Sequence, residues 1–267
     1  MTKLACALAI GGLDPGGGAG VLADVRAFGA AGAFGCAAVA VVTVQSTSGM
    51  RSARAVPTRE VIAQAREVVR NQRVRAIKVG ALGSRANVVA VAALIANARV
   101  PAVVDTPMLA TRGRGRLLDA RAIDAFRRAL VPRATLVTAN AAEAEALTGT
   151  RVASVGGAHD AATALVKLGA RAALVKGGHL GGASAIDVLA VDGEVIELRA
   201  RRLAIASTHG TGCTFASLVA GRLARAPRAN EAAIVDAVRW AKRVHHAALA
   251  REDDAGGAQR VIAFALR

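Results

Sequence analysis

The chain has 267 residues, of which 54% are hydrophobic and only 2% aromatic, and its net charge is +16. So few aromatic side chains exclude a base-stacking surface for RNA, and arginines spread along the chain indicate a GC-rich genome rather than a nucleic-acid binder. The three cysteines, Cys6, Cys36 and Cys213, form no CxxC pair, which argues against a disulfide framework or zinc site and favours a cytoplasmic protein.

The chain begins with a short apolar stretch that could pass for a signal peptide, but the Asp-Pro-Gly-rich continuation indicates a buried strand and a turn. No apolar run approaches the roughly 18 residues of a membrane span. In chain order we expect strand Leu4–Ile10, helix Gly20–Ala31, strand Gly35–Val44, helix Glu60–Asn71, strand Ala76–Val79, helix Arg85–Ala98, strand Ala102–Val104, helix Arg121–Ala129, strand Ala134–Thr138, helix Ala141–Leu147, helix His159–Leu168, strand Ala172–Lys176, a hairpin of Ala185–Val191 and Val195–Ala200 around Asp192-Gly193, and helices Thr214–Ala224 and Asn230–Ala250.

Short strands that are apolar on both faces and separated by helices are typical of a mostly parallel sheet covered on both sides. Such sheets bind ligands at the carboxyl ends of their strands. The polar and glycine-rich stretches follow strands, so we expect them to share one edge. Without a visible repeat or linker, residues 1–267 are predicted to form one α/β domain.

Two stretches near the start suggest a small-molecule site. IGGLDPGGGAGVLADVR, from Ile10 to Arg26, has glycines that let backbone approach a ligand, although it matches neither a Walker A loop nor GxGxxG. Its acids Asp14 and Asp24 also fit a turn cap and a solvent-facing residue. In VVTVQSTSG, Gln45 offers a donor and an acceptor to a ring edge, or is an ordinary loop residue.

Three stretches in the middle of the chain fit a nucleotide-phosphate site. Asp105 ends a strand in VVDTPMLATRGRGRLL, where a carboxylate often serves a metal or phosphate site; arginines 112, 114 and 116 behind it are either solvated or able to cover polyphosphate. Asn140 and Glu143 fit both a capping box and a Mg²⁺ environment. Lys176, ahead of flexible glycines, can reach a phosphate.

The stretch THGTGCTFASLVAG places a glycine-rich loop at the start of a helix. Backbone N–H groups of Gly210, Thr211, Gly212 and Cys213 would point outward there, and together with the helix dipole they form an anion hole. A transferring phosphoryl group is the expected anion. Because a helix N-terminus lowers a thiol pKa, we expect some Cys213 thiolate at neutral pH; a buried inert cysteine is the alternative.

Together these stretches resemble the hydroxymethylpyrimidine/phosphomethylpyrimidine kinases of thiamine biosynthesis, in the ribokinase superfamily. The resemblance runs from Leu8 to about Leu249 through IGGLDPGGGAGVLADV, FGCAAVAVVTVQSTSG, DTPMLAT, LVTANAAEAEALTG, VKGGH and THGTGC, in the family order. It implies a ribokinase-like three-layer α/β/α sandwich, usually homodimeric. It also implies two ATP-dependent phosphorylations, of 4-amino-5-hydroxymethyl-2-methylpyrimidine and then of its monophosphate.

The resemblance also implies roles for individual residues. The pyrimidine would contact Gly12, Asp24, Gln45, Ala81 and Pro107. Thr208, Asn140 and Lys176 would bind ATP together with Gly210 and Gly212, while Asp105 and Glu143 would hold Mg²⁺. Cys213 stands where many ribokinase relatives have an aspartate base, and with Lys176 and the Gly210–Gly212 backbone it would catalyse transfer.

Several departures from the family pattern reshape the implied pocket. Leu13 replaces a usual Ser or Thr, Ala81 replaces a Met that packs on the pyrimidine, and Pro107 stands where Val or Pro is found. The tail EDDAGGAQRVIAFALR lacks the usual Gly-His-Gly. The alternatives are a pyridoxal-type kinase and a non-enzymatic regulator with the same fold; retention of Lys176 and of the GTGC loop argues against the regulator.

Overall fold

The computed structural model describes residues 3–107, 122–178, 180–205, 208–251 and 253–264. Within them one nine-stranded sheet has the order β3-β2-β1-β4-β5-β6-β7-β8-β9. Neighbouring strands from β2 to β7 in this order pair in parallel, whereas β3, β8 and β9 pair antiparallel to their neighbours. The strands are β1 Cys6–Leu13, β2 Phe34–Ser46, β3 Gly49–Ala55, β4 Val74–Val79, β5 Ala102–Asp105, β6 Leu136–Asn140, β7 Ala172–Lys176, β8 Ser184–Val191 and β9 Glu194–Arg201.

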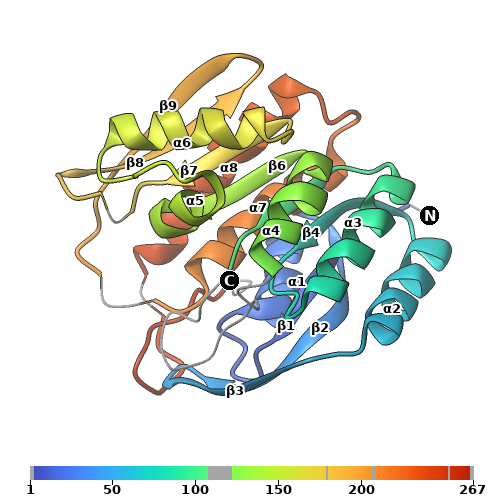
Figure 1. The fold of residues 1–267 in the computed structure, drawn as a ribbon. Coiled ribbons are helices and arrows are strands. Elements are labelled where there is room, and N and C mark those ends of the chain that lie inside the picture. The colour runs from blue at the N-terminus through green and yellow to red at the C-terminus, as the bar shows by residue number, and fades with distance from the viewer. Residues whose placement is uncertain (1–2, 108–121, 179, 206–207, 252, 265–267) are drawn as a thin grey trace.

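Helices cover both faces of this sheet, which makes the three layers visible in Figure 1. Two separate apolar clusters fill the spaces on its two sides. On one side lie α1 Gly20–Ala30, α7 Thr211–Arg225 and α8 Glu231–Leu249. On the other lie α2 Thr58–Asn71, α3 Arg85–Ala98, α4 Ile123–Ala125, α5 Ala141–Thr148 and α6 Val155–Lys167. The predicted three-layer α/β/α sandwich with a mostly parallel sheet is confirmed.

Central strands are buried on both faces, as their continuous apolar patterns predict. β5 and the first four residues of β7 are fully within the core. The tight turn between β8 and β9 is also as expected, because Asp192 and Gly193 both have positive φ, of 52° and 76°, which is the type I′ geometry favoured in two-residue hairpins.

Three elements differ most from the sequence prediction, whereas others, such as β1 and the start of α7, are shifted by two or three residues. The edge strand β3 was not expected, because GMRSARA contains a glycine and is largely solvent-exposed. The segment predicted as one helix, Arg121–Ala129, begins outside the described residues and continues as α4, a π-helical turn Phe126–Leu130 and a 3₁₀ turn Val131–Arg133. α6 begins four residues before the predicted His159, because Ser154 caps it by accepting a hydrogen bond from Gly157 N.

Candidate active site

A cavity of about 1020 Å³ lies at the carboxyl edge of the parallel strands. Each site residue predicted from the sequence lines it: Gly12, Asp24, Gln45, Ala81, Asp105, Pro107, Asn140, Glu143, Lys176, Thr208, Gly210, Thr211, Gly212 and Cys213. The three arginines proposed to cover polyphosphate, 112, 114 and 116, lie outside the described residues. The expectation of one shared edge is therefore confirmed for the motifs that the structure describes.

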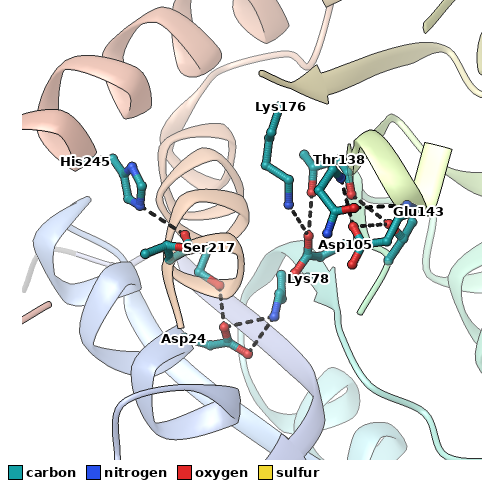
Figure 2. A network of polar contacts seen from close by, with 11 residues as sticks. Asp24, Lys78, Asp105, Thr138, Glu143, Lys176, Ser217 and His245 are labelled. Carbon is teal, nitrogen blue, oxygen red and sulfur yellow. Dashed lines mark hydrogen bonds and ion pairs between the residues drawn. The ribbon is translucent and has the colours of Figure 1, made fainter. Parts of the chain in front are cut away.

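Asp105 and Lys176 form an ion pair on one side of the cavity (Figure 2). Asp105 Oδ1 accepts hydrogen bonds from Lys176 Nζ at 3.1 Å and from Thr138 Oγ1 at 2.9 Å. Burial alone would raise the pKa of the Asp105 carboxyl, but the ammonium groups of Lys176 and Lys78 hold it below its usual range. Asp105 is thus an anion although it is almost wholly buried.

Glu143 lies beside this pair and closes the capping box that the sequence predicts for α5. Its Oε2 accepts from Asn140 N at 2.8 Å, and its own N donates to Asn140 Oδ1 at 2.9 Å. Thr106 Oγ1 donates to the same Oε2 at 2.9 Å. Burial raises the pKa of the Glu143 carboxyl, and the nearby Asp105 charge adds to the effect despite the opposing Lys176.

The two acids leave oxygens available to a cation. Within the described ranges, hydrogen bonds occupy only Oδ1 of Asp105 and Oε2 of Glu143, so Oδ2 and Oε1 accept none. No group of three or more His, Cys, Asp or Glu side chains that could hold a metal occurs among these residues. Two carboxylates without a full protein cage suit Mg²⁺, which takes its remaining ligands from phosphate and water.

The loop before α7 has the geometry expected of an anion site. Gly210 is its N-cap with φ of 72°, and a Cβ there would lie 2.0 Å from Gly18 O. The first hydrogen bond across this turn runs from Thr214 N to Gly210 O at 3.0 Å, so the N–H groups of the three preceding residues stand ahead of the helical ladder. A Cβ at Gly212 would lie 3.1 Å from Lys176 Nζ, which places the loop beside the lysine.

The expected lowering of the Cys213 pKa is wrong. Burial raises the pKa of this thiol to about 11, and the charges of Asp105 and Asp24 raise it further against the opposing effects of Lys78 and a hydrogen bond from the Gly20 backbone. Removal from water therefore outweighs the helix N-terminus. The thiol is overwhelmingly protonated at neutral pH in the protein without ligands.

The side of the cavity that the family resemblance assigns to the pyrimidine is walled by very small residues. A Cβ at Gly12 would lie 3.6 Å from the Ala81 Cβ, so the two positions face each other closely. Gln45 lies at the end of β2, with its side-chain amide 3.1 Å from His209 Nε2 and 3.3 Å from Thr43 Oγ1. The amide thus stands in a polar corner of a cavity that also includes Pro107.

Asp24 occupies a different position from the solvent-facing one that the sequence left open. Its carboxylate is fully buried, and it binds Lys78 Nζ through both oxygens at 2.9 and 3.0 Å. Ser217 Oγ of α7 donates to Oδ1 at 2.7 Å. Asp24 therefore reaches the cavity as part of a buried ion pair (Figure 2).

Sequence reasoning missed three groups that line the cavity. Lys78 stands in β4 between Ile77 and Val79, and a charge flanked by apolar residues near the end of a strand was the available signal. His209 Nε2 binds Asp14 Oδ2 at 2.9 Å, while Asp14 also caps its own turn through Gly16 N and Ala19 N. Lys242 of α8 pairs with Asp187 at 2.8 Å; no local motif pointed to this long-range contact.

The comparison with known families decides the relationship. The model of the phosphomethylpyrimidine kinase family matches residues 14–262. The chain belongs to this family. A hydroxymethylpyrimidine/phosphomethylpyrimidine kinase of Streptomyces coelicolor is 43% identical over 82% of this chain and 80% of its own length. The kinase of that name from Rhizobium meliloti is 37% identical over 93% and 92%.

Solved structures agree with membership of the phosphomethylpyrimidine kinase family. An ADP complex of Bacillus subtilis pyridoxal kinase has a TM-score of 0.84 at 27% identity, covering 97% of this chain and 98% of its own. Phosphomethylpyrimidine kinase of Clostridium difficile has a TM-score of 0.77, also at 27% identity, covering 91% and 98%. The first supports nucleotide binding in this fold, and the second supports the family.

Proposed function

We propose that this protein transfers the γ-phosphoryl group of ATP to 4-amino-5-hydroxymethyl-2-methylpyrimidine and then to the resulting monophosphate. The products are the monophosphate and diphosphate of the thiamine pyrimidine. Family membership supports this substrate class. The proposal includes that the same site performs both transfers.

The observation that carries the proposal is the position of the loop from Gly210 to Cys213 between two unlike halves of one cavity. On one side, Gly212 lies beside Lys176 and Asp105. On the other, Gly210 packs on Gly18 of the glycine-rich turn. Backbone donors between a phosphate-type half and a ring-type half suit a phosphoryl group in transit.

The chain's own residues would then divide the work of transfer. Lys176 contacts the nucleotide phosphates, and the backbone N–H groups of the loop bind the equatorial oxygens of the moving group. The acceptor oxygen bonds to the γ-phosphorus as the bond from that phosphorus to the bridging oxygen breaks, and ADP leaves with the bonding electron pair. In the first transfer the alcohol also loses its proton, which the thiolate form of Cys213 would take. Gly12, Ala81 and Gln45 would hold the pyrimidine so that its substituent points at the loop.

Asp105 and Glu143 would hold Mg²⁺ through their two available oxygens, with Asn140 and Thr208 lining the nucleotide half. When bound, Mg²⁺ neutralises charge on the nucleotide phosphates. Binding would also favour the ionised form of Glu143, because a cation opposes the effect of burial on its pKa. A Mg²⁺ titration of wild-type protein against Glu143→Gln tests this assignment: an unchanged Mg²⁺ requirement contradicts it.

The decisive experiment measures ATP consumption and product mass with the pyrimidine alcohol, its monophosphate and pyridoxal as separate acceptors. We expect both pyrimidines to be phosphorylated far faster than pyridoxal. Faster turnover of pyridoxal would make the protein a pyridoxal-type kinase instead. Transfer to the alcohol alone would limit the proposal to its first step.

We also propose that the chain acts as a cytoplasmic homodimer of single-domain subunits, as the family resemblance implies. No helix among the described residues is long and apolar enough to cross a membrane. Light scattering on the purified protein tests the assembly, and a mass of one chain, 26.9 kDa, would contradict it. A single calorimetric transition would support one domain per subunit.

A further inference from the structure

Lys78 of β4 is a fully buried lysine that no part of the proposed mechanism uses. Its side chain is about as inaccessible as that of its partner Asp24, at 1% and 0% exposure. Ser217 holds the other side of the Asp24 carboxylate (Figure 2). Burying a charge pair costs free energy that often exceeds its mutual attraction. A contribution of this ion pair to the stability of the fold therefore does not by itself explain why a lysine is buried here.

The Lys78 ammonium retains an unused donor. A lysine ammonium has three N–H groups, and Asp24 accepts two of them, at 2.9 and 3.0 Å. Among the residues that the structure describes, no other acceptor bonds Nζ. Lys78 lines the cavity, so an acceptor atom bound there can take the third N–H.

Glycine at position 80 leaves space beside this buried ammonium, on the side of the ring-binding half. A Cβ at Gly80 would lie only 2.9 Å from Lys78 Nζ, so a larger residue would crowd the ammonium. Ala81 comes next in the chain and faces Gly12 across the ring-binding wall. Lys78 therefore stands directly beside the wall to which the acceptor is assigned.

The charge of Lys78 also acts on the loop end of the cavity. It opposes the rise in the Cys213 pKa and lowers that of Asp105, so both groups are within its electrostatic reach. The other lysine near the loop, Lys176, is paired with Asp105 on the nucleotide side. Lys78 is thus placed between the ring and the loop.

We propose that Lys78 is the acceptor-side cation for the second transfer and donates its third N–H to the phosphate of the pyrimidine monophosphate. The inference rests on the proposed function. At pH 7 a phosphate monoester carries about −1.5 to −2 charges, and it would enter a cavity already lined by Asp24, Asp105 and Glu143. The neutral alcohol of the first transfer meets no such repulsion.

In this step Lys78 keeps all three protons. A phosphate oxygen of the dianionic monoester bonds to the γ-phosphorus of ATP, the bond from that phosphorus to the bridging oxygen breaks, and ADP leaves with the bonding electron pair. No proton is released by the dianion. Asp24 acts as a positioning residue, because both of its oxygens bind the ammonium.

The test compares kcat/KM for the two acceptors in Lys78→Met. We expect the value for the monophosphate to fall roughly 10- to 100-fold more than that for the alcohol, the range for one hydrogen bond to a charged group. If kcat/KM falls equally for both acceptors, so that the ratio of the two values is unchanged, the proposal is overturned. If the wild-type protein phosphorylates neither pyrimidine, it is the proposed function that has failed.

Removing the lysine alone leaves the Asp24 carboxylate buried without its cation, so folding is controlled by a second variant. Lys78→Met combined with Asp24→Asn removes both charges and must show the same shift in acceptor ratio. Ser217→Ala, which takes one hydrogen bond from Asp24 but leaves the cation, should preserve the ratio. A circular-dichroism melt of each protein checks that it is folded.

A crystal structure of the wild-type protein with the pyrimidine monophosphate decides the point without any variant. The proposal requires Lys78 Nζ within hydrogen-bond distance, roughly 3.2 Å or less, of a phosphate oxygen. A phosphate bound elsewhere in the cavity, with Nζ contacting only Asp24, would overturn it.

Discussion

The partly buried Cys213 thiol gives the first transfer a testable pH dependence. With a pKa of about 11, only about one thiol in ten thousand is ionised at pH 7, and the ionised fraction rises tenfold for each pH unit. If Cys213 takes the proton of the alcohol, kcat/KM for the alcohol in the wild-type protein should rise between pH 7 and 9. The monophosphate, already ionised, should show little of this rise.

Cys213→Ala provides the comparison for that profile. The variant should lose the rise with pH and lower the first transfer by roughly 10²–10⁴-fold, the usual contribution of a general base, with a much smaller effect on the second. Equal losses in both transfers and unchanged pH profiles would mean that the side chain only packs beneath the loop.

Lys176 should affect both transfers alike, because both use the same nucleotide. We expect Lys176→Gln to lower kcat with either acceptor by a similar factor of roughly 10² or more, as when one preorganised donor is lost. Steady-state kinetics with the alcohol and the monophosphate measure it. Should one transfer be spared, the lysine would have to be reassigned to the acceptor side, where we place Lys78.

In the proposed pocket, Ala81 would leave room against the pyrimidine ring. Ala81→Met should lower KM for the alcohol, corresponding to roughly 1 kcal/mol, because the added thioether buries apolar surface against the pyrimidine. Ala142→Met, at a cavity position beside Glu143, is the matched control and should leave this KM unchanged. An unchanged or higher KM in Ala81→Met would contradict the placement of the ring.

At the scale of elements, the loop before α7 depends on its close contact with the glycine-rich turn. Gly210→Ala would place a Cβ 2.0 Å from Gly18 O on a left-handed backbone. We expect a large loss of both transfers because the loop must move. Gly149→Ala has the same kind of backbone, with φ of 75°, but nothing within 4 Å, so it should show only the strain of roughly 1 kcal/mol in thermal unfolding. Similar activity in the two variants would mean that the loop tolerates displacement.

The sequence predicts an element well where a strong local motif specifies it. It predicts poorly where contacts with another part of the fold determine the structure. The I′ turn at Asp192-Gly193 and the capping box of Asn140 and Glu143 are local chemistry, and both are present. β3 is a strand because it pairs with the edge of β2, not because of its composition. The pKa of Cys213 likewise depends on burial contributed by distant segments, which outweighs the helix end visible in the sequence.

At the scale of the whole molecule, α7 and α8 are joined through the partly buried ring of His245. Its Nε2–H donates to Thr211 O at 3.0 Å, and the ring stands edge-on to Phe215 with 5.6 Å between centroids. This contact ties the start of α7 to α8. Burial lowers the pKa of His245 to about 4, so the folded protein holds this histidine neutral.

This arrangement predicts a loss of stability in mild acid. Between the ordinary histidine pKa of roughly 6.5 and the folded value of about 4, the unfolded chain binds a proton that the folded chain does not, so the free energy of unfolding falls as the pH falls. The contribution of His245 is full above pH 6.5 and should decline by roughly 1–3 kcal/mol by pH 4, since one pKa unit corresponds to about 1.4 kcal/mol.

Urea unfolding at several pH values measures this decline, and His245→Gln should make it shallower because glutamine does not titrate. Equal losses of stability in His245→Gln and the wild-type protein between pH 6.5 and 4 would contradict this prediction. They would mean that the His245 ring takes up its proton in the folded state, because water reaches the junction of α7 and α8.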